Sequence, residues 1–220
     1  MQPKNSWIVE SRKGYINPIL PFISDLGVTA PESSYFTLCL NIGAIMTPFT
    51  AFERYRVIKT YFNISTAQPR DLQLYHSYNK WSLVLWLMFS VGTLLAGNFM
   101  VSTHCYLHTT GAFILFMSLL IDMNIQSNIF YAMGDESTGR SMKRLAIVSL
   151  TIFTSYVLFF IYSLLLFPDM LYNTSARLMW DSSQPGYIPH VIACAMEWIL
   201  VALISPYCYS FARLDRLKLK

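Results

Sequence analysis

The chain has 220 residues, of which 54% are hydrophobic and 13% charged, and its mean hydropathy is +0.40. Soluble domains carry about 25% charged residues, so this composition argues against a soluble domain and indicates a protein with several membrane-spanning helices. The formal net charge is +4, and nothing in the sequence points to a nucleic-acid partner.

A proline-rich segment, residues 14–34, precedes the first long apolar stretch. Its three prolines lack a backbone N–H and break any regular hydrogen-bond ladder, while the Ile, Leu and Phe residues between them favour leaving water. This combination suits the surface of a bilayer or a cover over the mouth of a helical bundle. We expect this cover on the lumenal side, with Asp25 and Glu32 capping or hydrogen-bonding helix ends.

Five apolar windows are predicted to span a bilayer, which takes about 20 helical residues. The windows are residues 35–52, 81–101, 107–132, 145–167 and 188–211. We therefore expect an all-α membrane protein, a polytopic helical bundle with five spans, that forms a single membrane domain over residues 1–220.

The basic residues predict how these spans are oriented. Of the 16 Lys and Arg, 12 lie in the loop 53–80, the loop 133–144 and the tail 212–220. By the positive-inside rule these parts are cytosolic, which places the C-terminus in the cytosol and residues 14–34 in the lumen. The sequon at Asn173 is then a predicted glycosylation site. We expect the basic groups to set topology; attraction of anionic lipid is the alternative.

Ionisable side chains at membrane depth are costly and point to function by default. His190 and Glu197 share one face of the last span because they are two helical turns apart, and Glu197 lies about 10 Å deeper. A hydrogen-bonded carboxyl that fixes helix packing, a role in binding a lipid headgroup or relaying protons, and catalysis all stay open for Glu197. His104 and His108 have a spacing compatible with a metal, but the pattern is weak and we predict no metal site.

A polar stripe runs along the third predicted span. Ser118, Asp122 and Gln126 are spaced four residues apart, and such stripes serve interhelical hydrogen bonding, which we expect here. The alternative is a polar cavity that faces a lipid or an ion.

Motifs of catalysis are missing from the sequence. It has no Gly-rich phosphate loop, no nucleophile elbow and no Ser/His/Asp arrangement, and the cysteine spacing predicts neither a disulfide framework nor zinc binding. We expect no enzyme activity and no cofactor. Tyr55 and Ile58 fit a Tyr-x-x-apolar sorting signal, a weak pattern that recurs by chance.

Several motifs, in order along the chain, resemble those of the DNA-damage-regulated autophagy modulator (DRAM) family. The first is N-P-x-x-P-x-I-S-D-x-G, from Asn17 to Gly27, followed by P-E-S. The others are R-Y-R at 54–56, G-N-F at 97–99, H-T-T-G-A-F at 108–113 and the stretch 190–198 with its final E-W. The similarity spans residues 14–212.

This resemblance implies a six-span protein of lysosomal or other endomembranes, so the first span is expected to be missing from this sequence. It implies a non-enzymatic regulator of autophagy whose partners are membrane lipids and other membrane proteins. Two other branches of the superfamily suggest alternatives: a plasma-membrane scaffold that regulates phosphatidylinositol 4-kinase, and a GPI-anchor lipid remodelling factor. We expect a lipid or partner protein to bind beneath residues 14–34, at a site formed by Asp25, Glu32, His108, His190 and Glu197.

Overall fold

The computed structural model describes residues 20–64, 69–171, 173 and 178–211. Within these residues it contains long α-helices and two short 3-10 helices, and no strand. The elements are η1 (Ile23–Gly27), α2 (Glu32–Ile64), α3 (Pro69–Asn98), α4 (Cys105–Ala132), α5 (Glu136–Leu166), η2 (Pro168–Leu171) and α7 (Tyr187–Ser210). Five of the helices are long and apolar enough to cross a membrane, which confirms the predicted all-α fold.

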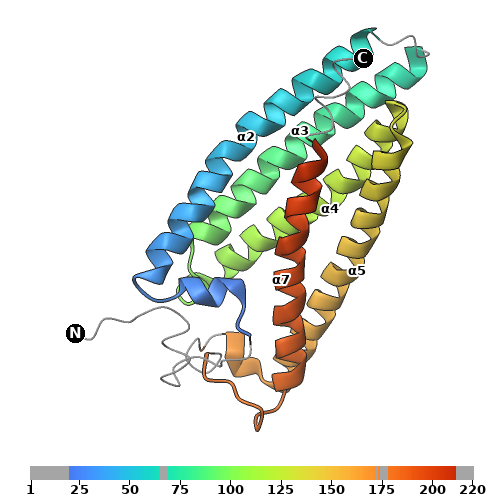
Figure 1. Ribbon diagram of the computed structural model, residues 1–220. Coiled ribbons are helices and arrows are strands. Elements are labelled where there is room, and N and C mark those ends of the chain that lie inside the picture. Colours follow the sequence, from blue (N-terminus) through green and yellow to red (C-terminus); the bar gives the residue numbers. More distant parts are fainter. Residues whose placement is uncertain (1–19, 65–68, 172, 174–177, 212–220) are drawn as a thin grey trace.

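The helices form an up-and-down bundle in which α2 packs on α3, α3 on α4, α4 on α5 and α5 on α7 (Figure 1). One end of the bundle, here called the segment end, carries η1, the α3–α4 turn and the connection from α5 to α7. The opposite end, here called the tail end, carries the α2–α3 connection, the α4–α5 turn and the last turn of α7.

The outer surface of the bundle is strongly apolar. Large side chains such as Phe49, Leu158 and Leu165 are 65%, 63% and 74% exposed. A soluble protein rarely exposes apolar patches of this extent, so this surface is suited to contact with lipid.

Two predicted loops are wrong, because both are largely helical. The predicted loop 53–80 consists of the end of α2 and the start of α3, and the predicted loop 133–144 is mostly the start of α5. Helix α2 continues past its apolar window because Ile58 and Phe62 bury one face there, at 0% and 1% exposed. The ring of Phe62 stacks on Tyr75 of α3 at a centroid distance of 5.1 Å.

Glycines set the close approach of α3 and α4. A Cβ added to Gly92 would lie 2.6 Å from the backbone nitrogen of Leu115, and one added to Gly111 would lie 2.7 Å from that of Ala96. Small residues at such a contact let two helix backbones pack directly, as is common between membrane helices.

Some predicted features lie outside the described residues. These are residues 14–19 of the proline-rich segment, which include Asn17 of the first motif, the basic tail 212–220, and the remainder of the sequon that begins at Asn173. Asn173 itself is exposed in the connection between α5 and α7.

Candidate functional site

The proline-rich segment docks on α7 through two hydrogen bonds. The backbone N–H of Ile23 donates to Glu197 Oε2 at 2.7 Å, and the indole N–H of Trp198 donates to the Pro21 carbonyl at 3.0 Å. Glu197 lies ten residues, or about 15 Å, along α7 from its first residue Tyr187. The segment therefore inserts between the helices as well as covering them.

This insertion gives Glu197 a physical role. Ile23 is the first residue of η1, and the first N–H groups of a helix have no partner within it. At membrane depth such groups need hydrogen-bond partners elsewhere in the protein. The Glu197 carboxyl is such a partner for the Ile23 N–H. The first of the three roles left open by the sequence, a hydrogen-bonded carboxyl that fixes packing, is the one that this geometry favours.

Phe22 anchors the inserted segment between α5 and α7. Its ring is 5% exposed and meets His190 edge-on at 5.0 Å, Phe160 at 5.8 Å and Tyr156 at 6.3 Å between centroids. Trp180, which is fully buried, also packs against His190, at 4.5 Å between centroids. His190 is thus part of the packing that holds the segment.

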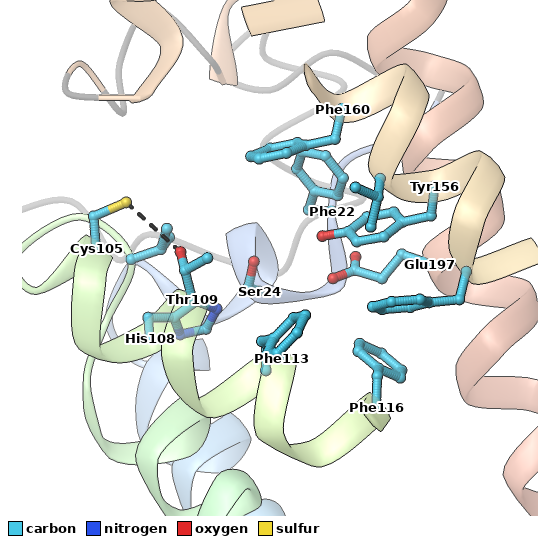
Figure 2. Close-up of a pocket in the computed structure, with 14 residues that line it drawn as sticks. Phe22, Ser24, Cys105, His108, Thr109, Phe113, Phe116, Tyr156, Phe160 and Glu197 are labelled. Carbon is cyan, nitrogen blue, oxygen red and sulfur yellow. Dashed lines mark hydrogen bonds between the residues drawn. The ribbon is translucent and has the colours of Figure 1, made fainter. Parts of the chain in front are cut away.

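A largely apolar cavity of about 230 Å³ lies beside Glu197 (Figure 2). Its walls come from η1, α4, α5 and α7, together with Val101 of the α3–α4 turn. The lining residues are Phe22, Ser24, Val101, Cys105, His108, Thr109, Ala112, Phe113, Phe116, Phe153, Tyr156, Val157, Phe160 and Glu197. Figure 2 shows the Glu197 carboxyl among aromatic rings, with Ser24 and His108 across from it.

His108 connects this cavity to the α3–α4 turn. Its Nδ1 lies 2.9 Å from the Phe99 carbonyl oxygen, and because a carbonyl only accepts, the imidazole Nδ1–H donates. His104, by contrast, is exposed. In the part of the chain that the structure describes, no group of three or more His, Cys, Asp and Glu could hold a metal ion.

The structure therefore brings only part of the predicted site together. Glu197 and His108 line the cavity, and His190 packs behind Phe22. Asp25 is buried at 3% exposed within η1, and neither it nor Glu32 lines the cavity. Glu32 Oε2 is buried without a hydrogen-bond partner among the described residues.

A second buried polar cluster lies toward the tail end, around Asp122 of the predicted stripe. Its carboxylate pairs with Arg54 of α2 at 3.4 Å and accepts from Trp86 Nε1 at 2.5 Å and from the hydroxyls of Ser82 and Tyr207. These donors come from α2, α3 and α7, so Asp122 joins three helices to α4.

The other two residues of the stripe differ from each other. Gln126 Nε2 donates to Ser82 Oγ at 2.8 Å and so contributes to the same cluster. Ser118 Oγ instead donates to the Ile114 carbonyl of its own helix at 2.6 Å, so its proton is not donated to another helix. Ser and Thr hydroxyls inside helices commonly donate to the backbone carbonyl four residues earlier in this way.

Sequence reasoning missed Arg54 because it placed this residue in a cytosolic loop. The side chain is 6% exposed, and its guanidinium carbon lies 4.4 Å from the Phe211 ring centroid and 5.2 Å from that of Trp86. The sequence pattern could have predicted that Arg54 is buried, because Ala51, Arg54 and Ile58 continue one buried helical face at spacings of three and four residues.

The sorting-signal interpretation of Tyr55 and Ile58 is at odds with the structure. Ile58 is 0% exposed in the core at the tail end, and the Tyr55 carbonyl accepts from Asn79 Nδ2 at 2.9 Å. A sorting adaptor needs the apolar side chain exposed, so this motif does not serve as a signal in the folded protein.

The connection between α5 and α7 has a defined turn outside the spans. Asp181 Oδ1 accepts from the Ser183 backbone N–H at 2.7 Å and from the Ser183 hydroxyl at 2.5 Å. These bonds hold the pKa of the Asp181 carboxyl below its usual value. Nearby, Trp180 Nε1 donates to the Pro185 carbonyl at 3.2 Å, which keeps the indole against His190.

Comparison with known proteins covers nearly the whole chain. A sequence model of the family described as the Frag1/DRAM/Sfk1/Cwh43P N-terminal domain matches residues 4–213. The chain belongs to this family. The resemblance read from its motifs is thereby confirmed, and the inserted segment, the cavity and the Asp122 cluster all lie within the matched region.

Several curated relatives carry autophagy in their names. DNA damage-regulated autophagy modulator protein 2 of Bos taurus is 30% identical over 199 residues, which cover 88% of this chain and 71% of that protein. DNA damage-regulated autophagy modulator protein 1 of Homo sapiens is 27% identical over 88% of this chain and 76% of its own length. The modulator of macroautophagy TMEM150B of Xenopus tropicalis is 32% identical over 54% of this chain and 47% of its own. No solved structure matches the chain.

Proposed function

We propose that this chain is a non-enzymatic regulator of autophagy in endolysosomal membranes. Its membership of the Frag1/DRAM/Sfk1/Cwh43P family and its relatives named as autophagy modulators support a membrane protein that regulates autophagy. The endolysosomal compartment and the absence of catalysis are the further parts of the proposal.

One observation carries the proposed mechanism: Glu197 holds the inserted segment beside an aromatic cavity. The segment forms one wall of that cavity through Phe22 and Ser24. A lipid or a partner membrane protein that binds there changes how firmly the segment is docked, and the docked or released segment is the signal.

The polar groups of this site favour a structural role over a catalytic one. Glu197 accepts a hydrogen bond from the Ile23 N–H, and His108 donates one to the Phe99 carbonyl. Both groups thus hold backbone in place. The names of the relatives, which describe modulators, agree with this role.

We further propose that the tail end of the bundle faces the cytosol and the segment end the lumen. Basic side chains are exposed toward the tail end, including Lys59, Lys80, Lys143 and Arg144, as the positive-inside rule requires of the cytosolic side. Asn173 is exposed at the segment end, where a glycan would be added in the lumen.

The test is to express the chain with a C-terminal tag at near-native levels and score it against endolysosomal, plasma-membrane and ER markers. We expect residence on endolysosomes and a change in autophagic flux. Residence at the plasma membrane would overturn the proposal in favour of the phosphatidylinositol 4-kinase scaffold. Retention in the ER with altered display of GPI-anchored proteins would overturn it in favour of lipid remodelling.

A further inference from the structure

The cavity beside Glu197 has a nearly continuous aromatic lining. Neighbouring rings lie 5.8–6.4 Å apart between centroids, from α4 across α5 to η1. The rings are those of Phe113, Phe116, Phe153, Tyr156, Phe160 and Phe22. Such walls offer large apolar contact area and little specific polar recognition.

The cavity reaches the outer surface of the bundle at membrane depth. Helices α4 and α5 lie farther apart toward the segment end than at the tail end (Figure 1), and the cavity lies between them there. Phe113 lines it and is also 55% exposed. Phe113 is eight residues, about 12 Å, along α4 from Cys105, so this exposed wall of the cavity lies within a membrane-spanning helix.

The size of the cavity limits what fits inside. An apolar protein cavity of about 150 Å³ binds benzene, a molecule of six carbons. On that scale the 230 Å³ here admits about nine carbons. A stretch of linear hydrocarbon has this volume, whereas the fused ring system of a sterol is too large.

We propose that this cavity binds one acyl chain of a membrane lipid from the leaflet at the segment end. The remainder of the lipid stays in the bilayer, next to Phe113, which lines the cavity and is exposed on the outer surface of the bundle. The inference names the ligand class of the proposed regulatory site and rests on the proposed function for its biological consequence.

Binding of the acyl chain stabilises the docked segment, and the docked segment stabilises binding of the acyl chain. Phe22 belongs to the segment and forms part of the cavity wall, so the acyl chain gains its contact with Phe22 only when the segment is docked. A ligand that binds one state stabilises that state by mass action. The lipid thereby holds the segment on Glu197.

The test is photo-crosslinking of the purified full chain in phosphatidylcholine vesicles. A trace of phosphatidylcholine carries a diazirine midway along one acyl chain, and labelled peptides are mapped by mass spectrometry. Val157→Trp fills the cavity from α5, and Leu158→Trp is its matched control, because Leu158 is the next residue but is 63% exposed to lipid. In the parent chain we expect the label on the cavity residues of α4 and α5. This label should be lost in V157W and kept in L158W.

A second variant guards against a folding defect in V157W. Ala112→Leu narrows the cavity from α4 and is expected to reduce the same label, with helical content by circular dichroism matching the parent chain. Equal labelling of the parent and both filled variants would overturn the inference. So would cavity labelling by a photoactivatable sterol in place of the acyl probe. Because vesicles report binding without cells, a failure here is distinct from a failure of localisation or flux.

Discussion

The buried pair Arg54–Asp122 provides the sharpest energetic prediction. The two side chains are 6% and 2% exposed, and the carboxylate also accepts from Ser82, Trp86 and Tyr207. Asp122→Leu leaves the Arg54 charge buried and three donors unpaired. Removing one partner of a buried ion pair costs about 3–5 kcal/mol, so we expect a loss of unfolding free energy in that range.

The reverse change is expected to be milder. Arg54→Met removes the cation but leaves Asp122 with its three neutral donors, so we expect a loss near the lower limit, about 3 kcal/mol. In the double variant neither buried charge is left behind. The double variant should therefore lose less than the sum of the two single losses, with a coupling of at least about 1 kcal/mol.

The assay is unfolding of the purified protein in mixed micelles by increasing dodecyl sulfate, followed by circular dichroism. The matched control is the pair Arg140–Glu136, which joins the same kinds of group at 3.0 Å but is 58% and 69% exposed. Its coupling should be about 0.3–0.5 kcal/mol. Additive losses at Arg54 and Asp122, or a coupling no larger than that of the exposed pair, would refute the reasoning.

Three further predictions concern helix contact, segment docking and topology. Gly111→Ala should lower the unfolding free energy by about 1–3 kcal/mol, because the added Cβ would lie 2.7 Å from a backbone nitrogen of α3. The control Gly43→Ala, whose Cβ would have nothing within 4 Å, should be neutral or stabilising. Equal effects of the two variants in the same unfolding assay would contradict this prediction. Glu197→Leu should lower the unfolding free energy by about 1–3 kcal/mol, because it leaves the Ile23 N–H unpaired. Glu197→Gln keeps an oxygen acceptor, so its unfolding free energy should remain close to that of the parent. Equal losses of unfolding free energy in the two variants would show that this hydrogen bond is unimportant. Asn173→Gln should abolish a glycosidase-sensitive shift on a gel, and an unshifted parent chain would contradict the predicted glycosylation.

The five spans were readable from the sequence because each window is apolar over the length of a bilayer. The continuation of α2 and α3 beyond their apolar windows was not, since charge alone marked residues 53–80 as a loop. Arg54 shows the reason for this error. A basic residue can lie on a buried helical face when a carboxylate from another helix pairs with it, and here that carboxylate lies 68 residues away in the sequence.

The candidate site was predictable only in part. The depth of Glu197 in an apolar span predicts that it needs a partner, but that partner is the backbone N–H of Ile23, and a backbone group has no sequence signature. The cavity depends on the separation of α4 and α5 and on the insertion of Phe22 between α5 and α7. Neither packing feature follows from the residue pattern of a single helix.

The proposed function depends most on the docking of the inserted segment by Glu197. This is tested most directly by Ser24→Cys in a chain whose four native cysteines are replaced, reconstituted in vesicles and exposed to a membrane-impermeant maleimide. If the segment is docked, the cysteine introduced at position 24 should be labelled slowly both in the chain with Glu197 and in the Glu197→Gln variant. If Glu197→Leu weakens docking by about 1–3 kcal/mol, labelling should be about 5- to 150-fold faster. Equal and rapid labelling in all three chains would contradict the account.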